Sequence, residues 1–242
     1  MSVRLINLEA VVRDATVEKV RDDYIARFGP KSGKGLYYWQ DWARFNYVLP
    51  LLPHGKRALD VGVFTGQFFD SMTLSGKFQH VTGIDVVRKP NFYTITDEPD
   101  IREMNVAHLE FVDNSFDTVV CMEVIEHVDS HDYESSLSEL RRVSAQYLLI
   151  SVPFNEREPI SANHRRRFTP DDMLHVFPQA NYTLLYDPQQ KLFIWALIEE
   201  LPQAPPSLAA RAKGFMARRA AKKVLERAAR DPVGLARDAN LI

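Results

Sequence analysis

Short apolar segments alternate with longer mixed segments over residues 57–153. Four of them have the length and composition of buried strands: RALDVG, HVTGIDV, FDTVVCM and YLLISVP. Roughly 20 to 30 residues separate them, which leaves room for a crossover helix between parallel strands. The pattern therefore predicts a parallel sheet covered by helices.

The C-terminal part of this pattern differs. YTLLYD (182–187) and KLFIWALIEE (191–200) are separated only by PQQ, which is too short for a crossover helix. These two segments are expected to form an antiparallel hairpin, so the sheet is predicted to be mixed. TPDDMLHVF (169–177) carries a threonine N-cap, a proline at the first helical position and acids in the first turn, which predicts a helix before the hairpin.

The two ends of the chain are predicted to be helical. Apolar residues recur at helical spacing over 8–28, and 36–52 reads as an aromatic-rich helix. After LPQAPPS the chain becomes basic and alanine-rich. The resulting division is an N-terminal helical cap (1–54), a core (55–200) and a basic C-terminal helical extension (201–242).

The composition of the chain limits its expected partners and its expected location in the cell. The 242 residues carry a net charge of −2, so the chain as a whole has no strong attraction to nucleic acid or to an anionic membrane. A single cysteine, Cys121, cannot form an internal disulfide, and the first residues include acids where a signal peptide needs an apolar run. A cytoplasmic location is expected. The apolar run 192–198 is far shorter than the roughly 20 residues that span a bilayer.

The segment ALDVGVFTGQFFDSM (58–72) reads as a strand, a turn with two glycines, and a helix. Gly62 and Gly66 would let the backbone approach a ligand, and N–H groups at the helix start could face a negative group. About 20 residues further, the next strand ends in Asp85, where a carboxylate can accept hydrogen bonds from both hydroxyls of a ribose. Together these features indicate a nucleotide-like cofactor.

With three further stretches, NVAHLEFVDNSFD (105–117), VVCMEVIEHV (119–128) and RRVSAQYLLISVPF (141–154), the sequence resembles the class I S-adenosylmethionine-dependent methyltransferases of the small-molecule type. The resemblance covers about residues 55 to 200. It implies a doubly wound, Rossmann-like mixed sheet of seven strands with the antiparallel hairpin at its edge, and S-adenosyl-L-methionine as cofactor.

The resemblance also implies the cofactor-binding residues. Asp60, Gly62, Phe64, Thr65 and Gly66 would line the methionine and ribose parts, and Asp85 would hold the ribose hydroxyls. The remaining members of the implied set are Val86, Asn105 and Val106 near the adenine and Cys121, Met122 and Glu123 near the methionine or the substrate.

Two positions depart from the family pattern. Phe64 stands where a middle glycine is usual, so the turn is predicted to keep φ negative there, with the ring turned away from the cofactor. Asn105 replaces the commoner aspartate; its amide can both donate and accept. Phe64 also motivates an alternative, a cofactor-binding protein without catalytic activity or a protein that has lost the cofactor altogether.

Methyl transfer depends mainly on alignment, and a general base is needed only for a weakly acidic acceptor. His127 and His164 are the candidates. The first expectation is that the protein binds no metal ion. As an alternative, Glu123, Glu126, His127 and His164 together resemble the metal site of the small-RNA 3′-end 2′-O-methyltransferases, and mixed oxygen and nitrogen ligands suit such an ion.

The acceptor is not fixed by the sequence. A small molecule or a saccharide or lipid-linked intermediate is expected, with Tyr38, Trp39 and Arg166 as candidate substrate contacts. The basic C-terminal helix is either a solvated face or a weak contact to a membrane surface, a lipid-linked substrate or nucleic acid. Acceptor atom and oligomeric state are left open.

Overall fold

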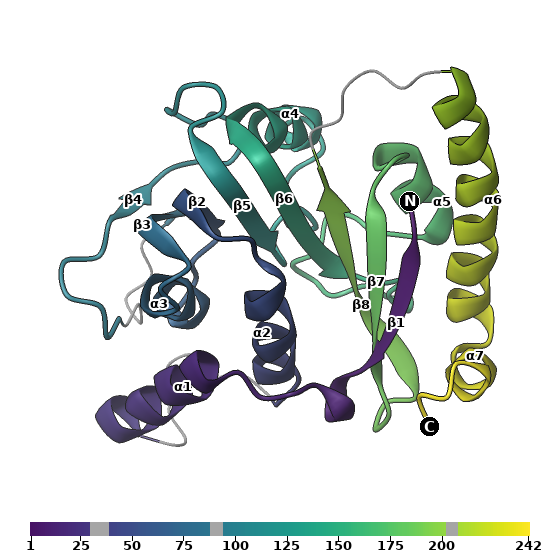
Figure 1. The fold of residues 1–242 in the computed structure, drawn as a ribbon, viewed down its shortest axis with the longest axis horizontal. Helices are drawn as coiled ribbons and strands as arrows, with labels where there is room; N and C mark the ends of the chain where they lie inside the picture. The colour runs from purple at the N-terminus through teal and green to yellow at the C-terminus, as the bar shows by residue number, and fades with distance from the viewer. Residues whose placement is uncertain (30–38, 88–93, 202–207) are drawn as a thin grey trace. The chain divides into compact units, whose positions relative to one another are not determined.

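The computed structural model describes residues 1–29, 39–87, 94–201 and 208–242. The chain divides into two compact units (Figure 1). The first unit comprises Val11–Cys121 and Asp132–Tyr147. The second unit comprises Met1–Ala10, Met122–His131 and Leu148–Ile242.

The first unit contains four parallel strands in the order β5-β2-β3-β4. Their bounds are β2 (Gly55–Val61), β3 (Phe78–Asp85), β4 (Ile101–Glu103) and β5 (Phe116–Met122). The helices of this unit are α1 (Ala15–Phe28), α2 (Trp39–Leu51), α3 (Gln67–Leu74) and α4 (Tyr133–Val143). In the register, Val61 pairs with both Ile84 and Cys121, so the carboxyl ends of β2, β3 and β5 lie side by side.

The second unit is built on strands in the order β1-β7-β8-β6, in which β8 runs antiparallel to both neighbours and β1 pairs parallel with β7. Their bounds are β1 (Val3–Asn7), β6 (Ser144–Pro153), β7 (Asn181–Asp187) and β8 (Leu192–Glu200). The other elements are η1 (Leu8–Ala10), α5 (Pro170–Val176), α6 (Leu208–Arg230) and α7 (Pro232–Asp238). Helix α6 packs along α5, β1 and β8 (Figure 1).

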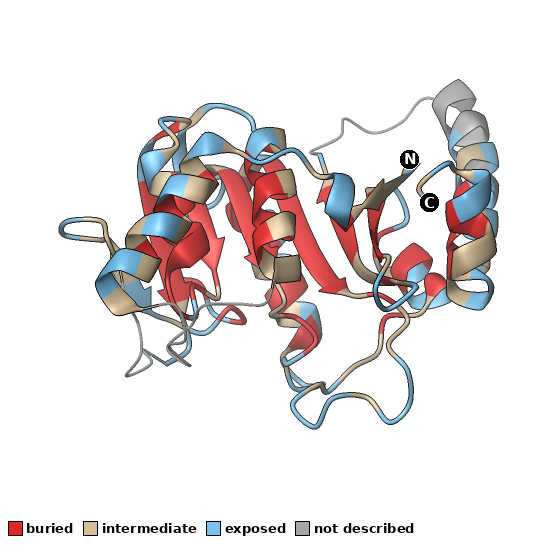
Figure 2. Ribbon diagram, turned by 90° about the horizontal axis from the view of Figure 1, so that it is seen from below, coloured by how far each residue is buried: buried red, intermediate tan, exposed pale blue. Residues whose placement is uncertain are grey.

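The central strands of each unit are buried and the outer faces of its helices are exposed, whereas β1 and β4 have only intermediate or exposed residues (Figure 2). Residues Ala58 to Val61 of β2 are all buried, as expected for a central parallel strand covered on both faces. Gly83 of β3 allows close packing, because a Cβ there would lie 2.7 Å from a methyl carbon of Val63. No helix in the described ranges has the length and apolar character needed to cross a membrane.

The α/β class, the mixed sheet and the antiparallel hairpin are confirmed. The helix predicted over 169–177 begins at Pro170, where Thr169 and Asp172 form a reciprocal capping box. The strand count was wrong: eight strands are described, not seven. Six of the eight strands were assigned to segments of the sequence; the short β1 and β4 were not, because tertiary pairing, rather than a strong local pattern, makes them strands.

The N-terminal helix begins later than predicted. The Asp14 side chain accepts hydrogen bonds from the N–H groups of Thr16 and Val17, so α1 starts at Ala15 and not near Leu8. The predicted helix over 36–52 is observed from Trp39 to Leu51, and its first residues lie outside the described residues. The three-part domain division stays a prediction.

Candidate functional site

The turn between β2 and α3 has an alternating backbone conformation. Gly62, Phe64 and Gly66 have φ values of 79°, 48° and 95°. Gly66 is also the N-cap residue of α3, so the turn leads directly into this helix. Three left-handed residues in five fold the chain back tightly, as a glycine-rich ligand turn requires.

The prediction that Phe64 keeps a negative φ was wrong. Its φ of 48° places a residue with a Cβ in the left-handed region, which is disfavoured by roughly 1–2 kcal/mol. The backbone therefore follows the path that a glycine would take, and the side chain is 39% exposed.

Asp85 fixes this turn from the end of the neighbouring strand. Its Oδ2 accepts the N–H of Phe64 at 2.9 Å, and its Oδ1 accepts the N–H of Val87 at 3.3 Å. The N–H groups of Gly62 and Val63 donate to the carbonyl of Ile84, at 2.8 and 3.1 Å. Hydrogen bonds therefore connect the predicted turn to the end of β3, where Asp85 is predicted to bind the ribose.

Asp60 is a buried acid next to this turn. Asp60 is only 3% exposed, and none of the described residues donates a hydrogen bond to its carboxyl group. Burial, with a smaller contribution from the negative charge of Asp85, raises the pKa of Asp60 to about 7. A cation bound here would stabilise the ionised carboxylate.

The other predicted cofactor residues of the first unit have different environments. Thr65 is fully buried, and its hydroxyl donates to Oε1 of Gln67. Asn105 is exposed and its Oδ1 accepts the N–H of Ala107 at 2.9 Å. Of the three apolar members, Val106 and Cys121 are buried, whereas Val86 is 61% exposed. A flat apolar ligand surface could cover Val86.

Met122 and Glu123 belong to the second unit, at the end of β5 and just after it. Glu123 has a left-handed φ of 54°, and its N–H donates to the carbonyl of Ser151 at 3.0 Å. The hydroxyl of Ser151 in turn donates to Oε1 of Glu123 at 2.7 Å. The first hydrogen bond fixes the backbone of Glu123 and the second orients its side chain.

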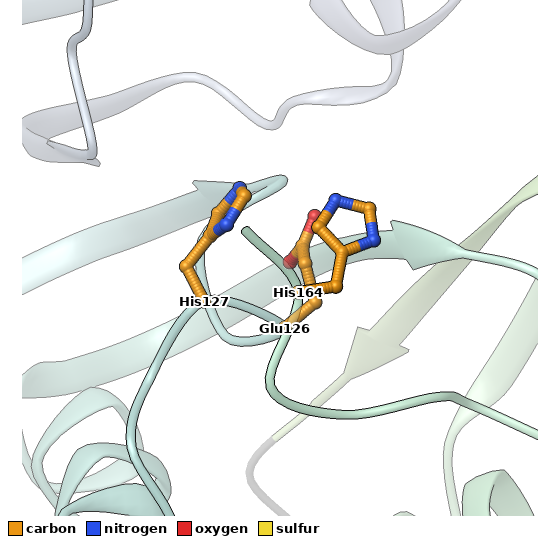
Figure 3. A group of neighbouring side chains, drawn as sticks. All are labelled: Glu126, His127 and His164. Carbon is orange, nitrogen blue, oxygen red and sulfur yellow. The ribbon is translucent and has the colours of Figure 1, made fainter. Parts of the chain in front are cut away.

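The second unit also brings together Glu126, His127 and His164. One ligand atom from each lies within 4.8 Å of the others. The two imidazole rings are 4.9 Å apart between centroids, at an angle of 71°. Figure 3 shows the three side chains extending in the same direction, with Glu126 buried at 1% exposure. We call these residues the acid–imidazole cluster.

Both histidines of the cluster are oriented through Nδ1. His127 Nδ1 lies 3.0 Å from the carbonyl oxygen of Asn163, and His164 Nδ1 lies 2.6 Å from Oε2 of Glu156. An Nδ1–H bound to an oxygen leaves Nε2 as the nitrogen with a lone pair. The cluster therefore offers two imidazole nitrogens and a buried carboxylate, which suits either proton transfer or a divalent metal.

The remaining predicted residues are less informative. Glu123, the fourth member of the alternative metal set, is a described residue outside the cluster. Arg166 is half-buried on the segment that carries His164, and Trp39 is half-buried at the start of α2. Tyr38 lies outside the described residues.

Residues 59–146 match the family model described as "Methyltransferase domain". This segment contains the 62–66 turn, Asp85 and all of β5. Over these residues the chain is similar to methyltransferase domains. The matched segment thus includes the turn after β2 and the strand-end acid that is hydrogen-bonded to it.

Curated relatives match over the same part of the chain. An enzyme of Vibrio cholerae named ubiquinone biosynthesis O-methyltransferase is 37% identical over 94 residues, which is 35% of this chain and 38% of that protein. The enzyme of the same name from Paracidovorax citrulli is 40% identical over 94 residues, 35% of this chain and 39% of that protein. The chain therefore spans about two fifths of the length of these relatives.

Solved structures show the same fold over a larger part of the chain. The N-methyltransferase NodS of Bradyrhizobium japonicum, in complex with S-adenosyl-L-homocysteine, aligns with a TM-score of 0.54 at 11% identity over 78% of this chain and 100% of that chain. Magnesium protoporphyrin IX methyltransferase of Synechocystis, with bound S-adenosylmethionine, aligns with a TM-score of 0.51 at 14% identity over 79% and 99%. At these identities the likeness establishes the fold, a Rossmann-like methyltransferase fold.

Sequence reasoning missed Glu156 and Asn163, which orient the two histidines. Neither residue belongs to a recognisable motif, and Glu156 precedes His164 by eight residues of irregular chain. Only the folded path of this segment brings its carboxylate to the imidazole.

Proposed function

We propose that this chain binds S-adenosyl-L-methionine and transfers its methyl group to a small molecule or to a saccharide or lipid-linked intermediate. The observation that carries the proposal is the 62–66 turn, whose Phe64 N–H is bound to Asp85. The family match over the same residues supports it.

The residues of the first unit fit this cofactor. Asp60 is a buried acid with a raised pKa, so a positively charged group of the cofactor would be favoured beside it. Asp85 keeps oxygen lone pairs beyond the two backbone hydrogen bonds that it accepts, and these can receive ribose hydroxyls. The exposed side chain of Val86 offers apolar surface for the adenine.

The bound cofactor supplies an electrophilic methyl group on a sulfonium. The residues of this chain would hold the cofactor and, for a weakly acidic acceptor, remove a proton. His127 and His164 are suited to that second role, because each has Nδ1 engaged by an oxygen and presents Nε2. The acceptor atom stays open among oxygen, nitrogen and carbon, because the relatives named for O-methylation match only 35% of the chain.

Incubation with S-adenosyl-L-methionine carrying a labelled methyl group tests the proposal. Labelled product is expected in the small-molecule or lipid fraction of a metabolite extract, with an equal amount of S-adenosyl-L-homocysteine. Asp85→Ala should reduce this turnover. Cofactor binding without any turnover against a broad set of acceptors would favour the alternative of a non-catalytic binding protein.

The acid–imidazole cluster favours a second candidate, a metal-dependent 2′-O-methyltransferase acting on RNA 3′ ends. Its three donor groups, Glu126, His127 and His164, are of the kinds that bind divalent transition metals. Glu156 and the carbonyl of Asn163 would be the outer hydrogen-bond partners of the histidines.

Titration with Co²⁺ separates the two candidates, because Co²⁺ bound to nitrogen and oxygen ligands has visible absorption bands. Stoichiometric binding that His164→Asn abolishes, together with turnover on RNA that a chelator stops, would support the second candidate. His175→Asn, at an exposed histidine of α5, is the matched control. Turnover on a small molecule that a chelator does not change would support the first.

A further inference from the structure

The second unit contains a pocket of about 640 Å³ to which neither candidate function assigns a ligand. It is bounded by the segment that follows β6, by the first residues of β8 and by the junction of α6 and α7. All of its lining residues belong to the second unit. Its volume lies in the range of roughly 300–1,000 Å³ that small-molecule sites occupy.

Part of the pocket lining is apolar. It includes Phe154, Leu192, Ile194 and Trp195, together with Pro232 of α7. Two aromatic rings and a proline provide flat surfaces against which an aromatic or other planar apolar group can pack.

The charged residues of the pocket are mostly basic. Arg157, Arg167 and Arg230 line it, against a single acid, Glu156. The carboxylate of Glu156 lies 2.6 Å from His164 Nδ1, so its capacity to bind an arginine is reduced. Arg167 donates to Oδ1 of Asn155 at 2.9 Å, which holds its guanidinium in place at the pocket.

The other two arginines are available to a ligand. Arg157 and Arg230 are exposed, and across the described parts of the chain neither forms an ion pair. They come from segments more than 70 residues apart, the loop after β6 and the last residue of α6, and converge on one pocket. Guanidinium groups bind carboxylate, sulfonate or phosphate oxygens in a two-pronged manner.

We propose that this pocket binds a small molecule with a planar apolar body and one anionic group. The body packs against Trp195 and Phe154, and the anion is bound by Arg157 and Arg230 at the rim. This site lies wholly within the second unit and does not depend on the proposed methyl transfer.

Two fluorescent probes that differ in charge test the proposal. Dansylglycine has an aromatic body with a carboxylate, and dansylamide has the same body without the charge. The protein is expected to bind dansylglycine about tenfold more tightly, the scale of one charge-assisted hydrogen bond. The double substitution R157Q/R230Q should remove that preference and leave the affinity for dansylamide within about twofold.

Two further variants locate the probe. Ala229→Trp, which places a large side chain on a lining residue, should abolish binding of both probes. Ala220→Trp, at an exposed position of the same helix, should change neither affinity. Equal affinity of the wild-type protein for the two probes, no binding of dansylglycine, or an equal effect of both tryptophan variants would overturn the proposal.

Discussion

The backbone N–H of Phe64 lies 2.9 Å from Oδ2 of Asp85, and this hydrogen bond joins the turn after β2 to the end of β3. It links two residues 21 positions apart, both of which the sequence marks as cofactor contacts. A left-handed Phe64 is tolerated because the bond to a carboxylate offsets part of its strain. The acid therefore shapes the turn in addition to its proposed role as a cofactor contact.

Phe64→Gly is expected to increase the free energy of unfolding by about 0.5–1 kcal/mol. Glycine adopts a φ of 48° without strain, although it also increases the entropy of the unfolded chain. Urea denaturation measures the change. Phe64→Ala, which removes the ring but keeps the Cβ, should give no such gain; equal stabilisation by both substitutions would contradict the strain at this position.

The raised pKa of Asp60 predicts a pH-dependent stability. Between pH 3.8 and about 7 the folded protein keeps a proton that the unfolded chain loses, so its stability falls as the pH rises through this window. The shift of the Asp60 pKa from 3.8 to about 7 corresponds to a loss of roughly 4 kcal/mol in the free energy of unfolding once the pH is above this window.

Asp60→Asn removes this titration while keeping the size of the side chain. The difference in free energy of unfolding between Asp60→Asn and the wild type should therefore shift in favour of the variant from pH 5 to pH 8. Urea denaturation at both pH values measures it. A difference that stays constant would show that Asp60 is ionised across the whole range.

Asp70 of α3 holds a different part of the first unit together. Its buried carboxylate accepts five hydrogen bonds, from the hydroxyls of Tyr24, Thr94 and Thr96 and from the N–H groups of Ile95 and Thr96. Asp70→Asn places an NH₂ group among these donors and is expected to destabilise the protein by about 3 kcal/mol.

Thermal unfolding of two variants measures the contribution of this network. Tyr24→Phe removes one of the five donors and should destabilise the protein by about 1 kcal/mol. If Asp70→Asn changed the melting temperature no more than Tyr24→Phe does, the carboxylate would not be the centre of the network.

The sequence was sufficient to predict the parts of the fold that have strong local patterns. Buried strands such as β2 and β5, the capped helix at Pro170 and the final hairpin follow from periodicity and from turn and cap residues. Strand β1 did not follow, because its five residues become a strand through pairing with β7, almost 180 residues away.

The candidate site was predictable to a similar extent. Asp85 and the two glycines could be named from spacing, whereas the φ of Phe64 could not, because local preference opposes it and a tertiary hydrogen bond to Asp85 supports it. Likewise His127 and His164 could be listed, but their partner Glu156 depends on the path of an irregular loop.

Calorimetric titration with S-adenosyl-L-homocysteine measures whether this chain binds the cofactor through Asp85. The wild-type protein is expected to bind one equivalent, and Asp85→Ala should weaken the affinity by at least ~1 kcal/mol, about fivefold, whereas Asp22→Ala at an exposed position of α1 should not change it. The absence of heat at millimolar ligand would contradict cofactor binding, and an Asp85→Ala variant that binds as tightly as the wild type would contradict the role of Asp85.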